Sequence, residues 1–291
     1  MNIKNSIFFA ESWNVAFRKT AVGAIFSDKT TKFNVIPNPV KFWAADPMVF
    51  KHCGKLYIFA ELYDYKLGRG TIGYTTFDGE HFQAWKQVIV EDFHMSYPFI
   101  FCIGESIYMI PETSDSNKLI LYKAVSFPDQ WEQTKIIAEN VRWVDTTLLM
   151  KENNILAYTE QLSDPHENLF LVFDNSFNLV SKKVIAVDSK TMRCGGRLFD
   201  YKEELVRVCQ DCEKKYGGAL LFRFCNSQSL NERTSIRIEP DEFLFDCKVY
   251  LDGMHTYSSL QEMEVIDIKT RRFNIYNLYF RVLNKLTHRG I

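Results

Sequence analysis

The sequence has 291 residues, of which 46% are hydrophobic and 15% aromatic, and its formal net charge is -1. The hydrophobic content suits a packed core, while the near-neutral charge offers no general attraction for nucleic acid, so we expect no nucleic-acid partner. No stretch of about 18 apolar residues occurs, and the sequence predicts no membrane-spanning helix. The seven cysteines are scattered and odd in number, which favours a reducing, cytoplasmic setting over a disulfide framework.

The chain begins with a strand-like segment at residues 13–18, and a two-part unit then recurs along it. In the first unit, Asp46 within Ala-Asp-Pro is followed fifteen residues later by Glu61. The same spacing joins three further pairs, namely Tyr97 and Glu112, Asp145 and Glu160, and Gly196 and Asp211. The units start about fifty residues apart, and self-similarity at this period is typical of a propeller or a solenoid.

Each unit has the pattern of an antiparallel hairpin, because turn residues such as Gly54 and Gly104 fall near the middle of the spacing. A hairpin with a central turn returns the second member of each pair beside the first. If these hairpins are the inner strands of successive blades, the paired groups gather around one mouth of a central channel.

Two further strand-like segments follow each hairpin, which gives the four strands of a propeller blade. A fifth, less regular unit covers residues 253–268 and places His255 at its mouth end. Residues 13–18 are expected to close the ring by completing this last blade. The sequence therefore predicts a single all-β domain over residues 1–291, a five-bladed β-propeller with a short C-terminal helix at residues 274–288.

The predicted mouth is rich in ionisable groups. Its carboxylates are Asp46, Glu61, Glu112, Asp145, Glu160 and Asp211. Its other polar groups are His94, Ser96, Tyr97, Arg193, Arg197, Gln210, Tyr216 and His255. Carboxylates gathered in a partly desolvated site have raised pKa values, which is how a catalytic acid or base arises.

Two features of this set predict chemistry on a sugar. Pro47 is expected to hold Asp46 in an extended conformation that presents its carboxylate, and paired carboxylates are what glycosyl chemistry uses. Arg193 and Arg197, four residues apart with two glycines between them, are expected to share a strand face and clamp phosphate oxygens.

The Ala-Asp-Pro opening resembles the inner strand of five-bladed glycosidases of the arabinanase and invertase–levansucrase type, where the aspartate is the base or nucleophile. A wider resemblance, over roughly residues 43 to 260, is to the propeller family of the N-terminal domain of plant glucosamine inositolphosphorylceramide transferases and bacterial polysaccharide-cluster proteins. It is carried by Ala45-Asp46-Pro47, His94-Met-Ser96-Tyr97-Pro98, Ile110-Pro111-Glu112-Thr113, Phe127-Pro128-x-x-Trp131, Arg193-x-x-Gly196-Arg197, Gln210-Asp211-Cys212 and Tyr216-Gly217.

This resemblance implies a cytoplasmic glycosyltransferase of bacterial surface-polysaccharide biosynthesis. Asp46 would activate an acceptor hydroxyl, with Glu112 and Asp145 as further catalytic groups, while Arg193, Arg197, His94 and His255 would hold the phosphate of the donor. The donor would be a nucleotide sugar or a phosphoribosyl pyrophosphate, and the acceptor a glycan or lipid-linked glycan. No metal motif is present, although Mg²⁺ could be held through phosphate oxygens.

Two alternatives stay open from the sequence. One is a glycoside hydrolase or phosphorylase that uses the same carboxylates, and the other is a glycan-binding propeller without catalysis. The C-terminal helix, apolar at helical spacing and basic at its end, is a candidate for contact with a membrane surface or with a biosynthetic complex.

Overall fold

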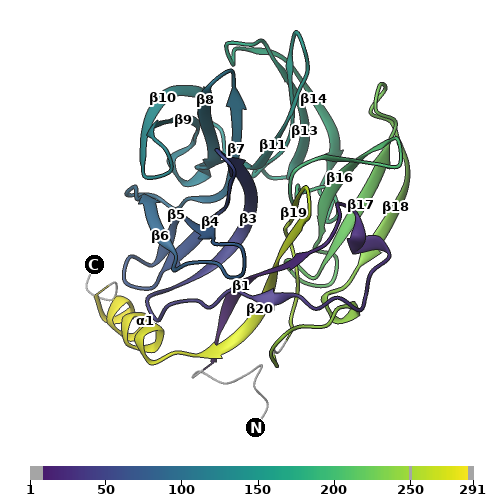
Figure 1. Cartoon of the computed structure of the whole chain (residues 1–291). Coiled ribbons are helices and arrows are strands. Elements are labelled where there is room, and N and C mark those ends of the chain that lie inside the picture. The colour runs from purple at the N-terminus through teal and green to yellow at the C-terminus, as the bar shows by residue number, and fades with distance from the viewer. Residues whose placement is uncertain (1–8, 249–250, 288–291) are drawn as a thin grey trace.

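The computed structural model describes residues 9–248 and 251–287, and these residues form five four-stranded antiparallel sheets arranged as the blades of a propeller (Figure 1). Blade one comprises β3 (Phe42–His52), β4 (Lys55–Asp64), β5 (Arg69–Phe77) and β6 (Lys86–Ile89). Blade two comprises β7 (Ser96–Ile103), β8 (Ser106–Glu112), β9 (Lys118–Ser126) and β10 (Gln130–Glu139). Blade three comprises β11 (Trp143–Met150), β12 (Ile155–Gln161), β13 (Glu167–Phe173) and β14 (Leu179–Val187). Blade four comprises β15 (Phe199–Tyr201), β16 (Glu204–Asp211), β17 (Ala219–Cys225) and β18 (Glu232–Ile238). Blade five comprises β19 (Tyr257–Leu260), β20 (Met263–Phe273), β1 (Phe9–Lys19) and β2 (Asn34–Val35). The predicted five-bladed fold is confirmed.

The N-terminal segment supplies the last two strands of blade five. β1 contains the segment expected to close the ring and pairs with β20 along its whole length, from Phe9 opposite Phe273 to Lys19 opposite Met263. Because β19 and β20 come from the other end of the chain, this sheet joins the two ends.

The helices among the described residues are few and short. α1 (Ile275–Thr287) follows β20, and residue 288, the last of the predicted helix, lies outside the described residues. Three single 3-10 turns occur in connections, at Ala24–Phe26, Ser114–Ser116 and Pro240–Glu242. Within the described ranges, no helix has the length and apolar character needed to cross a bilayer.

The core lies between neighbouring blades. Large buried side chains such as Phe59, Phe99 and Phe222 fill the spaces between sheets, which explains the high aromatic content. Arg18 on β1 is also fully buried and pairs with Glu264 on β20 at 2.7 Å, so the joining sheet contains a buried ion pair.

A β-bulge recurs near the start of the inner strand in blades one to three. The register shifts between Ala45 and Met48 in β3, and at the corresponding places in β7 and β11. The first residue of each bulge adopts a left-handed conformation, with φ of 53° at Asp46, 44° at Tyr97 and 50° at Asp145. Each bulge inserts an extra residue, so Glu61 pairs with Ala45 rather than with Asp46.

The bulge corrects two predictions. The paired groups are offset by one residue from the expected register, and Asp46 is not extended, although Pro47 follows it. Aspartate tolerates the left-handed region better than most residues. The main-chain N–H of Asp46 also donates to the carboxylate of Asp267 at 3.1 Å, which holds the bulge in place.

Candidate active site

The bulges bring a group of buried side chains to one mouth of the propeller, and Asp46 has contacts to two other blades there. Its Oδ1 accepts a hydrogen bond from the Thr256 hydroxyl at 2.9 Å, and its Oδ2 accepts one from the Tyr97 main-chain N–H at 3.2 Å. Burial raises the pKa of Asp46 to about 6, with His255 opposing this rise and the carboxylate of Asp145 adding to it. Asp46 is therefore a buried carboxyl group that is ionised at neutral pH.

His255 and Asp267 form a second pair beside Asp46. The Nδ1 of His255 lies 2.6 Å from Oδ2 of Asp267, and its Nε2 lies 3.7 Å from Oδ1 of Asp46. Burial acts to lower the pKa of His255, but the two carboxylates outweigh it, and the pKa is raised. Asp267 also accepts the main-chain N–H groups of His255 and Thr256, so it fixes the ring of His255 with Nε2 directed at Asp46.

Arg193 lies among the carboxylates of blades two and three. Its Nε is 2.5 Å from Asp145 and 3.9 Å from Glu160, and its Nη2 is 3.5 Å from Glu112. Although burial acts in the opposite direction, these acids raise the pKa of Arg193 well above its usual value. Gln210 adds a hydrogen bond from its amide to Asp145 at 2.8 Å. The sequence-predicted Arg193, Asp145, Glu112, Glu160 and Gln210 are thus brought together.

Glu112 is a further buried carboxyl group whose pKa is raised by its surroundings. Burial raises its pKa to about 8, the neighbouring Asp145 adds to this, and Arg193 and the Ser114 hydroxyl oppose it. At neutral pH Glu112 is therefore mainly protonated.

His94 and Glu61 line the blade-one side of the mouth. The Nδ1 of His94 accepts the main-chain N–H of Gly70 at 2.9 Å, which leaves Nε2 facing Glu61 Oε1 at 3.6 Å. Burial raises the pKa of Glu61 well above its ordinary value and lowers that of His94. A Cβ at Gly70 would lie 2.5 Å from Glu61 Oε1 and 2.9 Å from the His94 ring, so a larger residue would displace this pair.

Aromatic rings form the opposite rim of the mouth. Trp13 of β1 stacks on the His255 ring with centroids 3.9 Å apart, and Tyr216 packs edge-on to His255 at 5.5 Å. Tyr216 is 45% exposed and lies 5.6 Å from the Arg193 guanidinium. Lys269 Nζ lies over the same ring at 5.5 Å, so Tyr216 packs against two cations at the rim of the mouth.

A cavity of about 290 Å³ adjoins the mouth at the junction of blades three and four. Glu160, Arg193 and Tyr216 form its inner wall, while His166 and Lys190 lie on its outer side. His166 Nδ1 is 3.3 Å from Glu160 Oε1. The cavity extends from Arg193 and Glu160 to the exposed side chains of Lys190 and Asp188.

Several predicted site residues lie elsewhere. The Arg197 guanidinium donates to the main-chain oxygen of Ile100 and lies over the Phe99 ring, so the expected arginine pair does not form. Asp211 is turned toward Arg237 on β18, with Oδ2 2.5 Å from Nε. The strand register of blade four differs from the other blades, and Gln210 occupies the mouth position instead.

Tyr97 and Ser96 belong to the core beneath the mouth. The Tyr97 hydroxyl lies 2.6 Å from the Thr147 hydroxyl and accepts the Gly196 main-chain N–H at 2.8 Å. Ser96 is buried and pairs with Glu112 across β7 and β8. The glycine expected to allow approach of a phosphate instead allows approach of a strand, because a Cβ at Gly196 would lie 1.9 Å from the Tyr257 oxygen.

Asp46, His255 and Asp267 are the group of described residues whose ligand atoms lie close enough together, within 4.8 Å, to hold a metal ion. Both oxygens of Asp267 already accept hydrogen bonds, and one faces the His255 ring. A buried imidazole beside two carboxylates satisfies their charge without a metal, whereas Mg²⁺ prefers an all-oxygen octahedral shell. The donor set therefore fits a hydrogen-bonded triad better than a Mg²⁺ site.

The sequence reasoning missed Asp267, Trp13 and His166. Asp267 carried a signal, since it is a charged residue within the apolar run from Val265 to Ile268, and a buried charge in a strand requires partners. Trp13 was predicted only as part of the closing strand, and its contact with His255 depends on which blade that strand completes. His166 lies in a connection with no recognisable spacing.

Comparison with known proteins places this site in a family context. A family model described as "Glucosamine inositolphosphorylceramide transferase 1, N-terminal" matches residues 18–242. Glucosamine inositolphosphorylceramide transferase 1 of Arabidopsis thaliana is 30% identical over 185 residues, which are 60% of this chain and 24% of that protein. The protein of the same name from Oryza sativa subsp. indica is 27% identical over 187 residues, again 60% of this chain and 25% of that protein. The chain spans about a quarter of the length of these relatives.

Among solved structures, the catalytic domain of the GH62 α-L-arabinofuranosidase from Coprinopsis cinerea matches with a TM-score of 0.61 and 11% identity, over 88% of this chain and 97% of that chain. A family 117 glycoside hydrolase from Zobellia galactanivorans matches with a TM-score of 0.53 and 11% identity, over 91% of this chain and 92% of that chain. At these identities the likeness shows a shared fold. The family match covers most of the chain, from the end of β1 to the start of the connection into blade five, and the protein therefore belongs to the family of the glucosamine inositolphosphorylceramide transferase 1 N-terminal domain.

Proposed function

We propose that this protein is a glycosyltransferase that moves a sugar from a phosphate-activated donor to a hydroxyl group of a glycan or lipid-linked glycan. Asp46 acts as the base that removes the proton of the acceptor hydroxyl. The acceptor oxygen then attacks the anomeric carbon from the face opposite the phosphate, which leaves with its bonding electron pair, and the configuration inverts.

The observation that carries the proposal is the setting of Asp46. A general base is most effective when its pKa lies near the working pH, and a pKa of about 6 leaves this buried carboxylate ionised yet basic. The Thr256 hydroxyl and the Tyr97 N–H fix its orientation. His255 stabilises its charge, while Asp267 acts through His255 as a positioning residue.

The phosphate of the donor is assigned to the side of Arg193. The Arg193 side chain is 21% exposed, and the cavity beside it also carries His166 and Lys190. Arg197 has no part in this step, because its guanidinium is held at Ile100. A phosphate leaving group stabilised by Arg193 and Lys190 needs no protonation by the protein.

Membership of a family whose curated relatives are named as transferases favours transfer over hydrolysis. We assign the reaction to the cytoplasm and to the assembly of a bacterial surface polysaccharide. The seven cysteines, all of them free thiols, support a reducing compartment.

The second candidate is a glycoside hydrolase, and one observation favours it. Glu112, with a pKa of about 8, holds a proton at neutral pH and could serve as the acid that a hydrolase needs. Solved propellers of similar fold are glycoside hydrolases. A glycan-binding propeller without turnover is the third class to be separated.

A binding screen tests the proposal. The protein is titrated in a calorimeter with UDP-, GDP- and CMP-sugars, phosphoribosyl pyrophosphate and plain oligosaccharides, each with and without Mg²⁺. We expect one activated donor to bind, and Arg193→Lys to weaken it by about tenfold or more, since a lysine cannot reproduce the planar guanidinium contacts. Arg237→Lys, in a comparable ion pair away from the mouth, serves as the control. Binding of oligosaccharides alone would reject the transferase and leave the hydrolase or the lectin.

A further inference from the structure

An exposed apolar patch lies where helix α1 meets blade one. On the helix, Ile275 is 71% exposed, Tyr279 60% and Val282 51%. These positions are four and three residues apart, so they share one face of the helix. Val40, before β3, and Leu67, between β4 and β5, are exposed apolar residues of the neighbouring loops. We call these five residues the α1 patch.

The helix is fixed to the propeller by hydrogen bonds at its first turn. The side-chain oxygen of Asn274 accepts the N–H groups of Tyr276 and Asn277 at 2.9 and 3.2 Å, which caps the helix. The amide of Asn274 donates to the main-chain oxygen of Val40 at 3.0 Å. Asn277 is buried. Tyr276, Leu278 and Phe280 are half-buried, so the helix covers part of its apolar surface but leaves the face with Ile275, Tyr279 and Val282 exposed to solvent.

The patch lies at the mouth end of the propeller. β20 ends at Phe273, six residues and roughly 20 Å along an extended strand beyond Asp267, and α1 begins two residues later. Val40 precedes the strand that carries Asp46, and Leu67 follows the strand that carries Glu61. Figure 1 shows α1 at the outer edge of the ring, beside the blades that β3 to β6 and β20 belong to.

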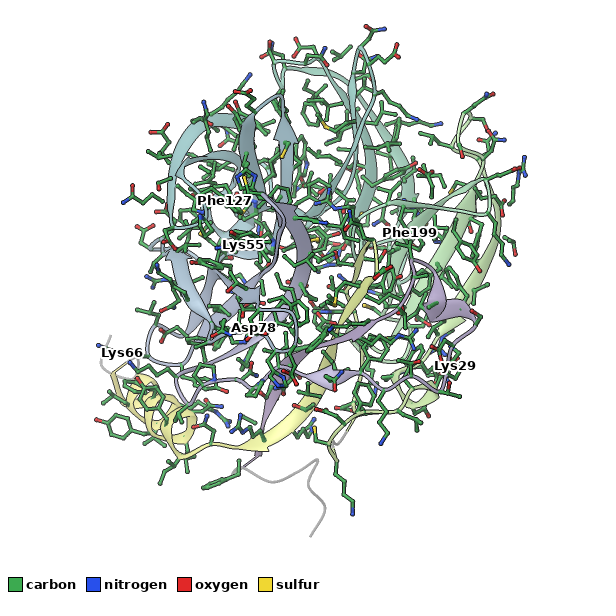
Figure 2. The ribbon with its side chains drawn as sticks, viewed as in Figure 1. Lys29, Lys55, Lys66, Asp78, Phe127 and Phe199 are labelled. Atoms are coloured by element: carbon green, nitrogen blue, oxygen red, sulfur yellow. The ribbon has the colours of Figure 1, made fainter. Side chains whose placement is uncertain are left out.

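Exposed basic side chains accompany the patch. Lys41 and Lys66 lie in the two loops, and their loops are joined by the hydrogen bond from the Tyr65 N–H to the Lys41 oxygen at 3.0 Å. Lys66 is labelled in Figure 2. Arg272, at the end of β20, and Arg281, on the helix, are also exposed.

We propose that the α1 patch docks the protein onto an anionic phospholipid bilayer with the mouth on the membrane side. A helix with an outward apolar face and basic neighbours is the pattern of an interfacial helix, whose apolar residues enter the headgroup region while its cations contact anionic lipids. The basic residues give the patch a charge that matches such a surface. If the proposed transfer reaction is correct, this orientation delivers a lipid-linked acceptor to Asp46.

Vesicle sedimentation tests the docking without any sugar substrate. The protein is mixed with vesicles of phosphatidylcholine and phosphatidylglycerol, or of phosphatidylcholine alone, and the bound fraction is measured at low and high salt. We expect binding to the anionic vesicles only, weakened by salt. The double variant Ile275→Glu/Tyr279→Glu should bind the anionic vesicles at least about tenfold more weakly, since it replaces two inserting apolar groups with anions.

A matched control uses Val125→Glu/Val180→Glu, which changes two exposed valines on blades two and three. It should bind as the unchanged protein does, and circular dichroism checks that both double variants are folded. Equal binding of all three proteins would overturn the proposal. A dimer that the patch variant disrupts, together with no vesicle binding, would instead identify the patch as a self-association surface. Neither result bears on the role of Asp46, which is tested by turnover.

Discussion

Asp46 and Glu112 are both buried carboxyl groups at one mouth, yet their surroundings favour different protonation states. Asp46 accepts two hydrogen bonds and faces the His255 ring, and its pKa rises only to about 6. Glu112 accepts one from Ser114, lies 3.5 Å from Arg193, and has a pKa raised to about 8. Burial raises both pKa values, but the next largest influence is the His255 ring, which lowers that of Asp46, and the Asp145 carboxylate, which raises that of Glu112.

Glu112 also makes a testable contribution to stability. Its pKa rises from 4.5 to about 8, so the folded protein binds a proton that the unfolded chain releases between these values. The favourable contribution is fully present below pH 4.5 and is lost as the pH rises through 8. The melting temperature of Glu112→Gln should therefore fall less between pH 5 and 9 than that of the unchanged protein, by about 2 °C or more. Parallel melting curves for the two proteins would contradict a raised pKa at this site.

At the residue scale, the sequence correctly predicts that five residues lie together at the mouth, namely Asp46, Asp145, Glu112, Arg193 and Gln210. Their spacing follows the hairpins, and hairpin geometry is regular. Arg197 and Asp211 depart from the prediction because the direction of a side chain depends on local register, which differs in blade four. Asp267 could not be assigned a role, since its contacts with His255 and Asp46 join segments far apart in the chain.

At the scale of elements, the sequence does not predict the β-bulge with a left-handed first residue near the start of the inner strands. A hairpin without a bulge would place Asp46 directly opposite Glu61, whereas the bulge turns the Asp46 main-chain N–H toward Asp267. Non-glycine residues rarely adopt this conformation, so an extended Ala-Asp-Pro was the reasonable expectation. The strands themselves were predictable, since apolar runs between turn residues mark them.

β1 closes the ring of blades, and the buried ion pair between β1 and β20 allows its contribution to stability to be tested. Arg18 donates two hydrogen bonds to one oxygen of Glu264, and both side chains are fully buried. Arg18→Met should lower the free energy of unfolding by about 3–5 kcal/mol, because it leaves Glu264 buried without its cation. Urea unfolding measures this, and Lys86→Met, which breaks the exposed pair with Asp129, should cost no more than about 1 kcal/mol. Similar losses in the two variants would contradict a special role of β1 in closure.

At the scale of the whole molecule, the five-bladed fold followed from the repeat, because four units at a regular period leave little choice of architecture. Blade five was the least regular part of the prediction, and it is the blade whose strands come from both chain ends. The family model covers the end of β1, β2 and blades one to four, while His255 and Asp267 lie beyond its end. Trp13, His255 and Asp267 thus extend the candidate site beyond the residues that the family model matches.

The most direct test of the proposed catalysis is a transfer assay with Asp46→Asn, using the donor that the binding screen identifies. The asparagine should be accommodated, because its oxygen can still accept the Tyr97 N–H while the Thr256 hydroxyl reverses to accept its amide. We expect the unchanged chain to form an inverted glycosidic product at a rate that rises with pH through about 6. Asp46→Asn should bind the donor normally and lose turnover by about 10²–10⁴-fold. Transfer at an undiminished rate by Asp46→Asn would show that Asp46 is not the base, and release of free sugar irrespective of acceptor would show a hydrolase.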